Sequence, residues 1–86
     1  MYYVYVLLGR NQKLYVGFTS NLRARIQQHQ NGEVWTTRRM LPVSLVFYEA
    51  FRAEADARRR EGYFKTTKGK SSLRQIIRES LSPLDT

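Results

Sequence analysis

The chain has 86 residues, enough for one small domain with a modest hydrophobic core. It contains no cysteine and one histidine, which excludes disulfides and thiolate metal sites and argues against a zinc cage, so any metal must have oxygen ligands. The apolar opening MYYVYVLL is too short to span a membrane and lacks the basic start and cleavage pattern of a leader. We therefore expect a cytoplasmic protein that does not contact a membrane.

Charge is the strongest signal in the composition. Fifteen lysines and arginines against seven acidic residues give a formal net charge of +8. Six of the fifteen precede Phe51, and nine lie between Arg52 and Arg78. A fold does not require such an excess, whereas a polyanionic partner does, so nucleic acid is the leading candidate for a partner. The alternative is a surface that is basic only for solubility.

Two strands joined by a turn are predicted at the start of the chain. Residues 1–8 alternate as a strand and carry apolar side chains on both sides, which predicts a central place in a sheet. The turn composition of residues 9–13 predicts a hairpin to an antiparallel second strand, Leu14–Phe18. In such a hairpin Tyr5 and Tyr15 lie near each other on one face of the sheet.

A helix is predicted from residue 21 to about residue 31, because polar residues can cap its start and Gly32 can end it. Arg25 and His29 are four residues apart and therefore project from one face of this helix. With Tyr15 on the preceding strand, they would bring a guanidinium, an imidazole and a phenol together. These are groups that handle phosphate.

A polar loop is predicted over residues 33–42. It contains Trp35 and the neighbouring residues Arg38 and Arg39, and an indole with two arginines suits contact with nucleic acid. The alternative, held equal, is that Trp35 and Met40 cover the edge of the core.

A third strand over Val43–Phe51 and a helix over Ala53–Lys65 are predicted next. Glu61 lies in the same helical stripe as Phe64, where an inward carboxylate costs several kcal/mol unless a cation or hydrogen bonds satisfy it. An arginine partner, or Lys65 four residues later, would be the ordinary explanation. A divalent metal would be the functional one.

The last predicted elements are a basic loop over residues 66–70, interrupted by Gly69, and a helix that Ser71 or Ser72 caps and that ends before Ser82. We expect residues 1–82 to form a single domain and residues 83–86 a frayed tail. The apolar face of the last helix would consist of Leu73, Ile76, Ile77 and Leu81.

The predicted groups suit phosphodiester hydrolysis, which needs a positioned nucleophile and neutralisation of charge on the phosphoryl oxygens. Magnesium can be bound by one protein carboxylate together with a substrate phosphate, which makes Glu61 a candidate ligand. Arg25 would bind phosphate oxygens through its planar fork, and His29 or Tyr15 would accept a proton from water. Each group alone has an ordinary structural explanation, so the hypothesis depends on their combination.

Four short blocks stand in the order and spacing of a known family. They are Tyr3-Val4-Tyr5, then Tyr15-Val16-Gly17, then Thr19-Ser20-Asn21-Leu22 with Arg25 and His29, and finally Arg60-Glu61-Gly62-Tyr63-Phe64-Lys65. Through these blocks residues 2–80 resemble a GIY-YIG nuclease domain. The chain is most similar to the short, free-standing bacterial type, which is related to the N-terminal domain of a bacterial excinuclease.

The resemblance implies an α+β fold, a three-stranded antiparallel sheet flanked by helices, and cleavage of DNA phosphodiester bonds with Mg²⁺ or Mn²⁺. Selectivity for DNA structure or damage, in repair or recombination, would follow. By position Tyr5 and Tyr15 are the motif tyrosines, and Tyr15 would activate or orient the attacking water. Arg25 would stabilise the phosphate and His29 would assist proton transfer. Glu61 would hold the metal.

The expected nucleic-acid-binding residues are the basic side chains of the polar loop and of the later basic stretch. The chain departs from the family in two places. Tyr3 stands where the motif has glycine. The last asparagine of the chain is Asn31, whereas many such nucleases use an asparagine near the end of the domain. The basic stretch would stand in for it. The alternatives are a nucleic-acid-binding module without catalysis, acting with a protein partner, and a basic protein-binding domain. The nucleic-acid-binding residues would be Arg38, Arg39, Lys65, Lys68 and Lys70.

Overall fold

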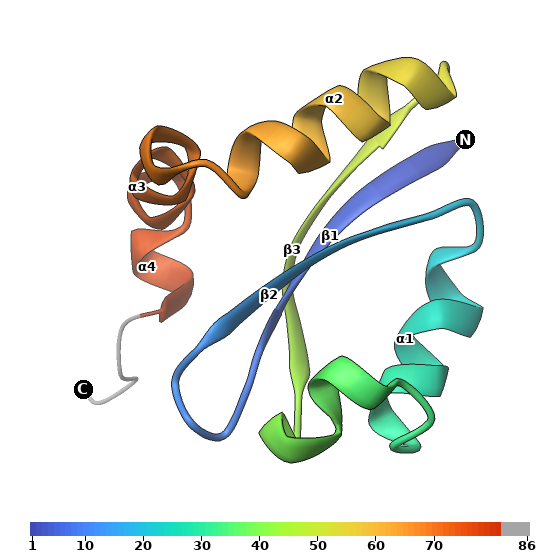
Figure 1. Ribbon diagram of the computed structural model, residues 1–86, viewed down its shortest axis with the longest axis vertical. Coiled ribbons are helices and arrows are strands. Elements are labelled where there is room, and N and C mark those ends of the chain that lie inside the picture. Colours follow the sequence, from blue (N-terminus) through green and yellow to red (C-terminus); the bar gives the residue numbers. More distant parts are fainter. Residues whose placement is uncertain (82–86) are drawn as a thin grey trace.

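A three-stranded antiparallel sheet lies between two groups of helices in the computed structural model, which describes residues 1–81 (Figure 1). The strand order is β2-β1-β3, so the α+β class and the central first strand are confirmed. The predicted domain end at residue 82 and the predicted tail lie outside the described residues. The strands are β1 (Tyr2–Leu8), β2 (Leu14–Thr19) and β3 (Ser44–Phe51). The helices are α1 (Leu22–Gln30), the 3₁₀ helix η1 (Trp35–Met40), α2 (Glu54–Phe64), α3 (Thr67–Ile76) and α4 (Arg78–Leu81).

The β1–β2 hairpin is confirmed. The Gly9 N–H donates to the Lys13 carbonyl at 2.9 Å and closes the turn. In the register of the two strands Tyr5 lies opposite Gly17, and Leu7 lies opposite Tyr15. The same-side placement of the two motif tyrosines follows directly from this register.

Among residues 1–81, no helix has the length and apolar character needed to cross a membrane.

Alternate residues of β1 face two different layers. Val4 and Val6 are fully buried and pack with Ala57 and Phe64 of α2 and Leu73 of α3 in an apolar core. Tyr5 and Leu7 point the other way, towards the layer that contains α1 and η1. Figure 1 shows these two layers on opposite sides of the sheet. We call them the apolar side and the polar side.

The predicted loop over residues 66–70 is wrong, because α3 already begins at Thr67. Thr66 is the cap rather than either serine, since its hydroxyl accepts a bond from the Gly69 N–H at 3.0 Å. Gly69 does not interrupt the structure. A Cβ atom there would overlap the Tyr63 carbonyl, so the glycine lets α3 pack directly against the end of α2.

The final helix also differs from the prediction, because it is two helices, α3 and α4, that meet at Ile77. Leu73 and Ile77 are buried as expected, but Ile76 is 48 % exposed and does not belong to the apolar face. The predicted polar loop likewise contains a regular element, η1, and this element buries Thr37.

Candidate active site

The pairing of β1 with β2 holds Tyr5 at the centre of the site. A Cβ atom at Gly17, its opposite neighbour, would overlap the Tyr5 phenol, so the glycine provides the space for the ring. Tyr15, on the same side of β2, has its ring centroid 6.3 Å from that of Tyr5. The tyrosine and the glycine of the Tyr-Val-Gly motif therefore have separate roles, and that of the glycine is steric.

Four side chains form a hydrogen-bonded chain on the polar side. The Tyr5 hydroxyl lies 2.7 Å from His29 Nε2 and accepts a bond from Arg25 Nε at 3.4 Å. His29 Nδ1 lies 2.7 Å from Thr37 Oγ1, and the Thr37 hydroxyl donates to the Val34 carbonyl at 3.5 Å. Tyr5, His29 and Thr37 are fully buried. Within the described part of the chain no buried side-chain nitrogen or oxygen lacks a partner, so this burial is satisfied.

The surroundings favour the neutral forms of the phenol and the imidazole. Burial is the main cause that raises the pKa of Tyr5 above 10.0, although the hydrogen bond from Arg25 opposes it. Burial, followed by the positive charge of Arg25, lowers the pKa of His29 below 6.5. At neutral pH Tyr5 therefore keeps its proton and His29 carries no charge.

These protonation states fix the direction of each bond in the chain. Arg25 can only donate, so the Tyr5 proton points to His29 Nε2. The one proton of the neutral imidazole then lies on Nδ1 and is donated to Thr37, whose own proton points to Val34. The chain runs in one direction from Arg25 to Val34 and assigns the Nδ1–H tautomer to His29.

Thr37 is the site residue that sequence reasoning missed. A threonine in a polar segment follows no pattern that marks it, and it reaches His29 only because η1 folds back over α1. A clue was present in the sequence, since a lone buried histidine needs a partner for each ring nitrogen. Tyr5 could supply only one of them.

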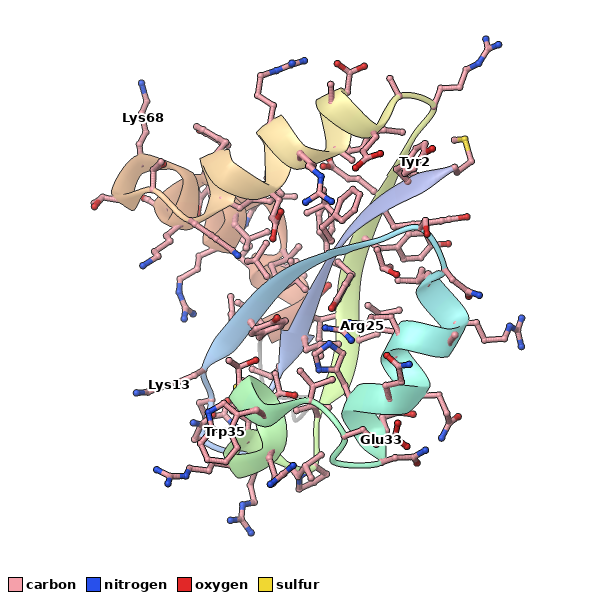
Figure 2. The ribbon with its side chains drawn as sticks, turned by 45° about the vertical axis from the view of Figure 1, so that its right-hand side comes forward. Tyr2, Lys13, Arg25, Glu33, Trp35 and Lys68 are labelled. Atoms are coloured by element: carbon pink, nitrogen blue, oxygen red, sulfur yellow. The ribbon has the colours of Figure 1, made fainter. Side chains whose placement is uncertain are left out.

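Burial divides the predicted catalytic residues into two groups. Tyr5 and His29 are fully buried, so neither side chain reaches the surface. Tyr15 and Arg25 are half-buried, and Figure 2 shows Arg25 pointing from α1 towards the sheet. The surface offered to a substrate therefore contains Tyr15 and Arg25. Tyr5 and His29 lie beneath this surface, and the Tyr5 hydroxyl is hydrogen-bonded to both Arg25 and His29.

Glu61 lies on α2 with its side chain 20 % exposed and accepts a bond from Lys65 Nζ at 3.0 Å. Arg60 is not its partner, since that guanidinium donates to Glu49 at 2.8 and 3.2 Å. Of the ordinary explanations for Glu61, the pair with Lys65 is the one observed. The Glu61 charge also adds to the effect of burial in raising the pKa of Tyr5. This effect is the smallest of those that shift the pKa of Tyr5.

Among residues 1–81, one mode of metal binding has suitable ligands. Residues 1–81 contain no group of three or more histidine, cysteine or acidic side chains that could hold a metal ion, so they form no protein cage. Mg²⁺ can instead be held by one carboxylate together with water and a substrate phosphate. Glu61 fits this mode, because its Lys65 partner is 54 % exposed and an exposed pair of this kind is weak enough to open.

The five predicted nucleic-acid-binding residues lie in three places. Lys65 and Lys70 line a pocket beside β2. Lys68 lies at the outer side of α3 and points away from the sheet (Figure 2). Arg38 and Arg39 are exposed on η1. The structure therefore brings two of the five together with the candidate active site.

Trp35 does not cover the core edge, because its side chain lies at the surface, 71 % exposed. Met40 does pack against the core, so only that half of the structural alternative is confirmed. The Arg38 guanidinium lies 5.5 Å from the centroid of the Trp35 ring. An exposed indole beside a cation is suited to stacking on a base, and the nucleic-acid contact stays a prediction for this segment.

Comparisons relate this chain to known sequences. The family model of the GIY-YIG catalytic domain matches residues 1–75. The UPF0213 protein CPE1444 of Clostridium perfringens is 39 % identical over 82 residues, which cover 94 % of this chain and 88 % of that protein. A UPF0213 protein of Pediococcus acidilactici is 36 % identical over 78 residues, which cover 87 % of this chain and 80 % of that protein.

A solved structure is also similar. The solution NMR structure of the UPF0213 protein BH0048 from Bacillus halodurans matches with a TM-score of 0.59 and 30 % sequence identity. The match covers 100 % of this chain and 99 % of that one. The region matched by the family model includes the whole hydrogen-bonded chain and Glu61.

Proposed function

This chain belongs to the GIY-YIG family, and from that premise we propose that it is a divalent-metal-dependent endonuclease that hydrolyses DNA phosphodiester bonds. The observation that carries the proposal is the buried, fully hydrogen-bonded chain from Arg25 to Thr37, together with a partly exposed carboxylate, Glu61, whose charge contributes to the raised pKa of Tyr5. A role in repair or recombination in the cytoplasm, with selectivity for DNA structure or damage, is part of the proposal.

Each residue has a role that its surroundings permit. Arg25, whose Nε is held by Tyr5, donates to the oxygens of the scissile phosphate. Tyr15 is half-buried beside the ring of His29 and orients the attacking water. Glu61 would hold Mg²⁺ or Mn²⁺, which would neutralise charge on the phosphate and activate the water.

Tyr5 and His29 act through their neighbours. Tyr5 positions the Arg25 guanidinium, because its oxygen accepts the Nε–H. A proton can reach the buried imidazole only through the Tyr5 hydroxyl, which would pass its own proton to His29 Nε2 as its oxygen takes another from the site. Thr37 positions His29 for that transfer by holding Nδ1–H.

One observation supports the alternative of a nucleic-acid-binding module without catalysis. Lys65 already bonds the candidate metal ligand Glu61. If neither DNA nor the metal displaces Lys65, Glu61 stays paired and holds no metal ion. Such a module would bind DNA in a salt-sensitive way without turnover.

Cleavage of a labelled panel tests the proposal. Duplex, flap, branched and single-stranded DNA are incubated with Mg²⁺, Mn²⁺ or a chelator and the wild-type protein, Glu61→Gln or Glu54→Gln. Glu54 is a matched control, because it pairs with Arg58 at i, i+4 on the same helix. We expect metal-dependent cutting that Glu61→Gln abolishes and Glu54→Gln retains. Binding without cutting by the wild type would replace the nuclease with the binding module.

A further inference from the structure

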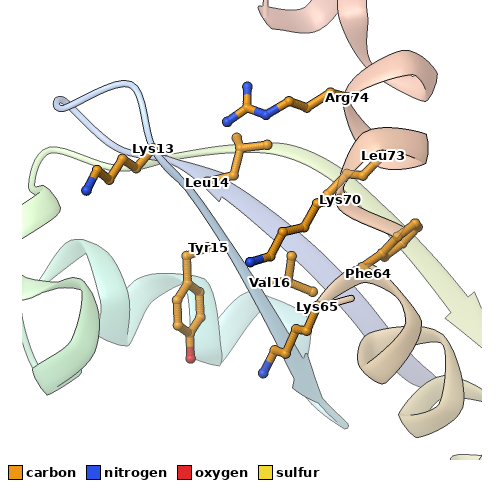
Figure 3. A pocket seen from close by; sticks show the side chains of 9 residues that line it. All are labelled: Lys13, Leu14, Tyr15, Val16, Phe64, Lys65, Lys70, Leu73 and Arg74. Atoms are coloured by element: carbon orange, nitrogen blue, oxygen red, sulfur yellow. The ribbon is translucent and has the colours of Figure 1, made fainter. Parts of the chain in front are cut away.

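A pocket of about 390 Å³ opens at the free edge of β2, between that strand and helices α2 and α3. Figure 3 shows four basic side chains around it, with Lys65 and Lys70 reaching from the helices towards the strand. Its floor is apolar. The basic side chains are Lys13, Lys65, Lys70 and Arg74, and the floor consists of Leu14, Val16, Phe64 and Leu73.

Three of the four cations have no anionic partner. In the described part of the chain the side chains of Lys13, Lys70 and Arg74 form no ion pair and no hydrogen bond. The arginines of α2 differ, because all three are paired with acidic residues. Positive charge is therefore paired with acidic residues along α2 and left unpaired at the pocket, where three cations surround one apolar surface.

The structure of α3 produces this arrangement. Lys70 and Arg74 are four residues apart on the helix and therefore lie on one face, next to the buried Leu73. Lys68 is two residues before Lys70 and projects from the other side. Lys70 therefore lines the pocket and Lys68 does not. Lys13 and Arg74 also line it, although no sequence pattern indicated them.

We propose that this pocket holds the sugar-phosphate backbone of DNA next to the scissile phosphate. Phosphate groups would contact Lys13, Lys70 and Arg74, and the carbon atoms of a deoxyribose would lie on the apolar floor. Tyr15 also lines the pocket, so a strand held there passes directly into the candidate active site. Lys65 joins the two, because it lines the pocket and bonds Glu61.

The pocket also provides a way to free the metal ligand. A phosphate that draws the Lys65 ammonium into the pocket would open its pair with Glu61, because phosphate and carboxylate compete for the same donor. The inference rests on the proposed function in that the ligand is DNA. DNA binding at the pocket does not require cleavage, so binding can be tested separately.

The test is the affinity of fluorescent DNA, measured by anisotropy over a series of salt concentrations in the presence of a chelator. The variants are Lys70→Gln and Arg74→Gln, with Arg52→Gln as the control of equal charge change. Arg52 precedes α2 and Lys65 follows it, so Arg52 lies at the end of α2 away from the pocket. All three side chains are exposed, so folding is preserved. We expect each pocket variant to weaken binding about 3- to 10-fold at low salt and to lower the salt slope by about one. Arg52→Gln should stay within about twofold of the wild type.

The two proposals can fail separately. Equal losses in Arg52→Gln and Lys70→Gln, or no loss in either, would overturn the pocket as the binding site even if the protein cuts DNA. Absence of DNA binding by the wild type would overturn it as well. Selective loss in Lys70→Gln and Arg74→Gln, in a protein that never cuts, would sustain the pocket and overturn only the nuclease.

Discussion

The two faces of β1 bury side chains of different kinds, and these side chains have different requirements. On the apolar side, Val4 and Val6 need only shape and volume to pack against α2 and α3. On the polar side, Tyr5 is equally buried but must place its hydroxyl between His29 and Arg25. Stability alone would be served by apolar residues on both sides. A small domain that buries a histidine and a threonine with matched partners uses part of its core for a polar network that packing alone does not require.

The contrast predicts different consequences for substitution on the two sides. Changes to the buried apolar residues of the apolar side should lower the free energy of unfolding and leave the hydrogen-bonded chain of the remaining folded molecules unchanged. Changes on the polar side should alter hydrogen bonding and protonation, with smaller costs in stability. The following experiments order these effects from the largest to the smallest.

Phe64→Ala should have the largest effect on stability. Phe64 is fully buried between the sheet and α3, and truncating a buried phenylalanine costs about 3–5 kcal/mol. Urea denaturation followed by circular dichroism measures this loss. A cost below about 1 kcal/mol would show that the apolar side does not hold the fold as described.

Gly17→Ala should break the polar side through a steric effect. The new Cβ atom would overlap the Tyr5 phenol, and overpacking of this kind costs about 1–3 kcal/mol. Gly62→Ala is the control, because a Cβ atom there meets nothing within 4 Å and alanine favours the helix. Thermal unfolding should separate the two variants. Equal stability would mean that Gly17 does not make room for Tyr5.

Thr37→Val should remove the hydrogen-bond partner of His29 Nδ1–H and lower the free energy of unfolding by about 1–3 kcal/mol. The loss should be smaller than that of Gly17→Ala, because a water molecule can take the place of the threonine hydroxyl. Because the chain has one histidine, its ring nitrogens can be followed by NMR without overlap. We expect the Nδ1–H tautomer in the wild type and in Thr37→Ser, and a mixture of tautomers in Thr37→Val. The Nε2–H tautomer in the wild type would reverse the direction assigned to the chain.

The pH dependence of stability should show the smallest effect. The pKa of His29 is lower in the folded protein than its ordinary value of 6.5, mainly because of burial, so the unfolded chain binds this proton more readily. The stabilisation that neutral His29 gives the folded protein is therefore fully present above pH 6.5, and it is lost as the pH falls below that value. Urea unfolding at pH 7.5 and pH 5 measures it. His29→Gln should remove that part of the pH dependence, and an unchanged profile would contradict it.

Much of this architecture was predictable because it depends on local patterns. Alternation along β1, the turn composition and the cap at Asn21 each specify structure within a few residues, and they placed Tyr5, Tyr15, Arg25 and His29 on one side. The hydrogen bond from Ala24 N–H to the Asn21 side chain, at 3.1 Å, shows the cap at work.

What escaped prediction depends on contacts between segments far apart in the sequence. Gly69 reads as a helix breaker by propensity, yet its missing side chain is what lets α3 pack on α2. Thr37 and Arg74 gain their positions only from the way η1 and α3 fold onto other elements. No periodicity within either segment records these contacts.

Two tyrosines on the polar side test the central claim most directly, which is that this side carries out chemistry on DNA. Tyr15 lies beside His29 at the candidate site, whereas Tyr48 lies opposite Tyr5 on β3 and is 53 % exposed. Replacing either by phenylalanine removes one hydroxyl group without disturbing a buried contact.

The measurement is the single-turnover rate of DNA cleavage with Mn²⁺ for the wild type, Tyr15→Phe and Tyr48→Phe, with DNA binding measured in parallel. We predict that Tyr15→Phe cuts at least about 100-fold more slowly at unchanged affinity, and that Tyr48→Phe cuts at the wild-type rate. Equal rates for the two variants would contradict the assignment of the polar side as the catalytic surface.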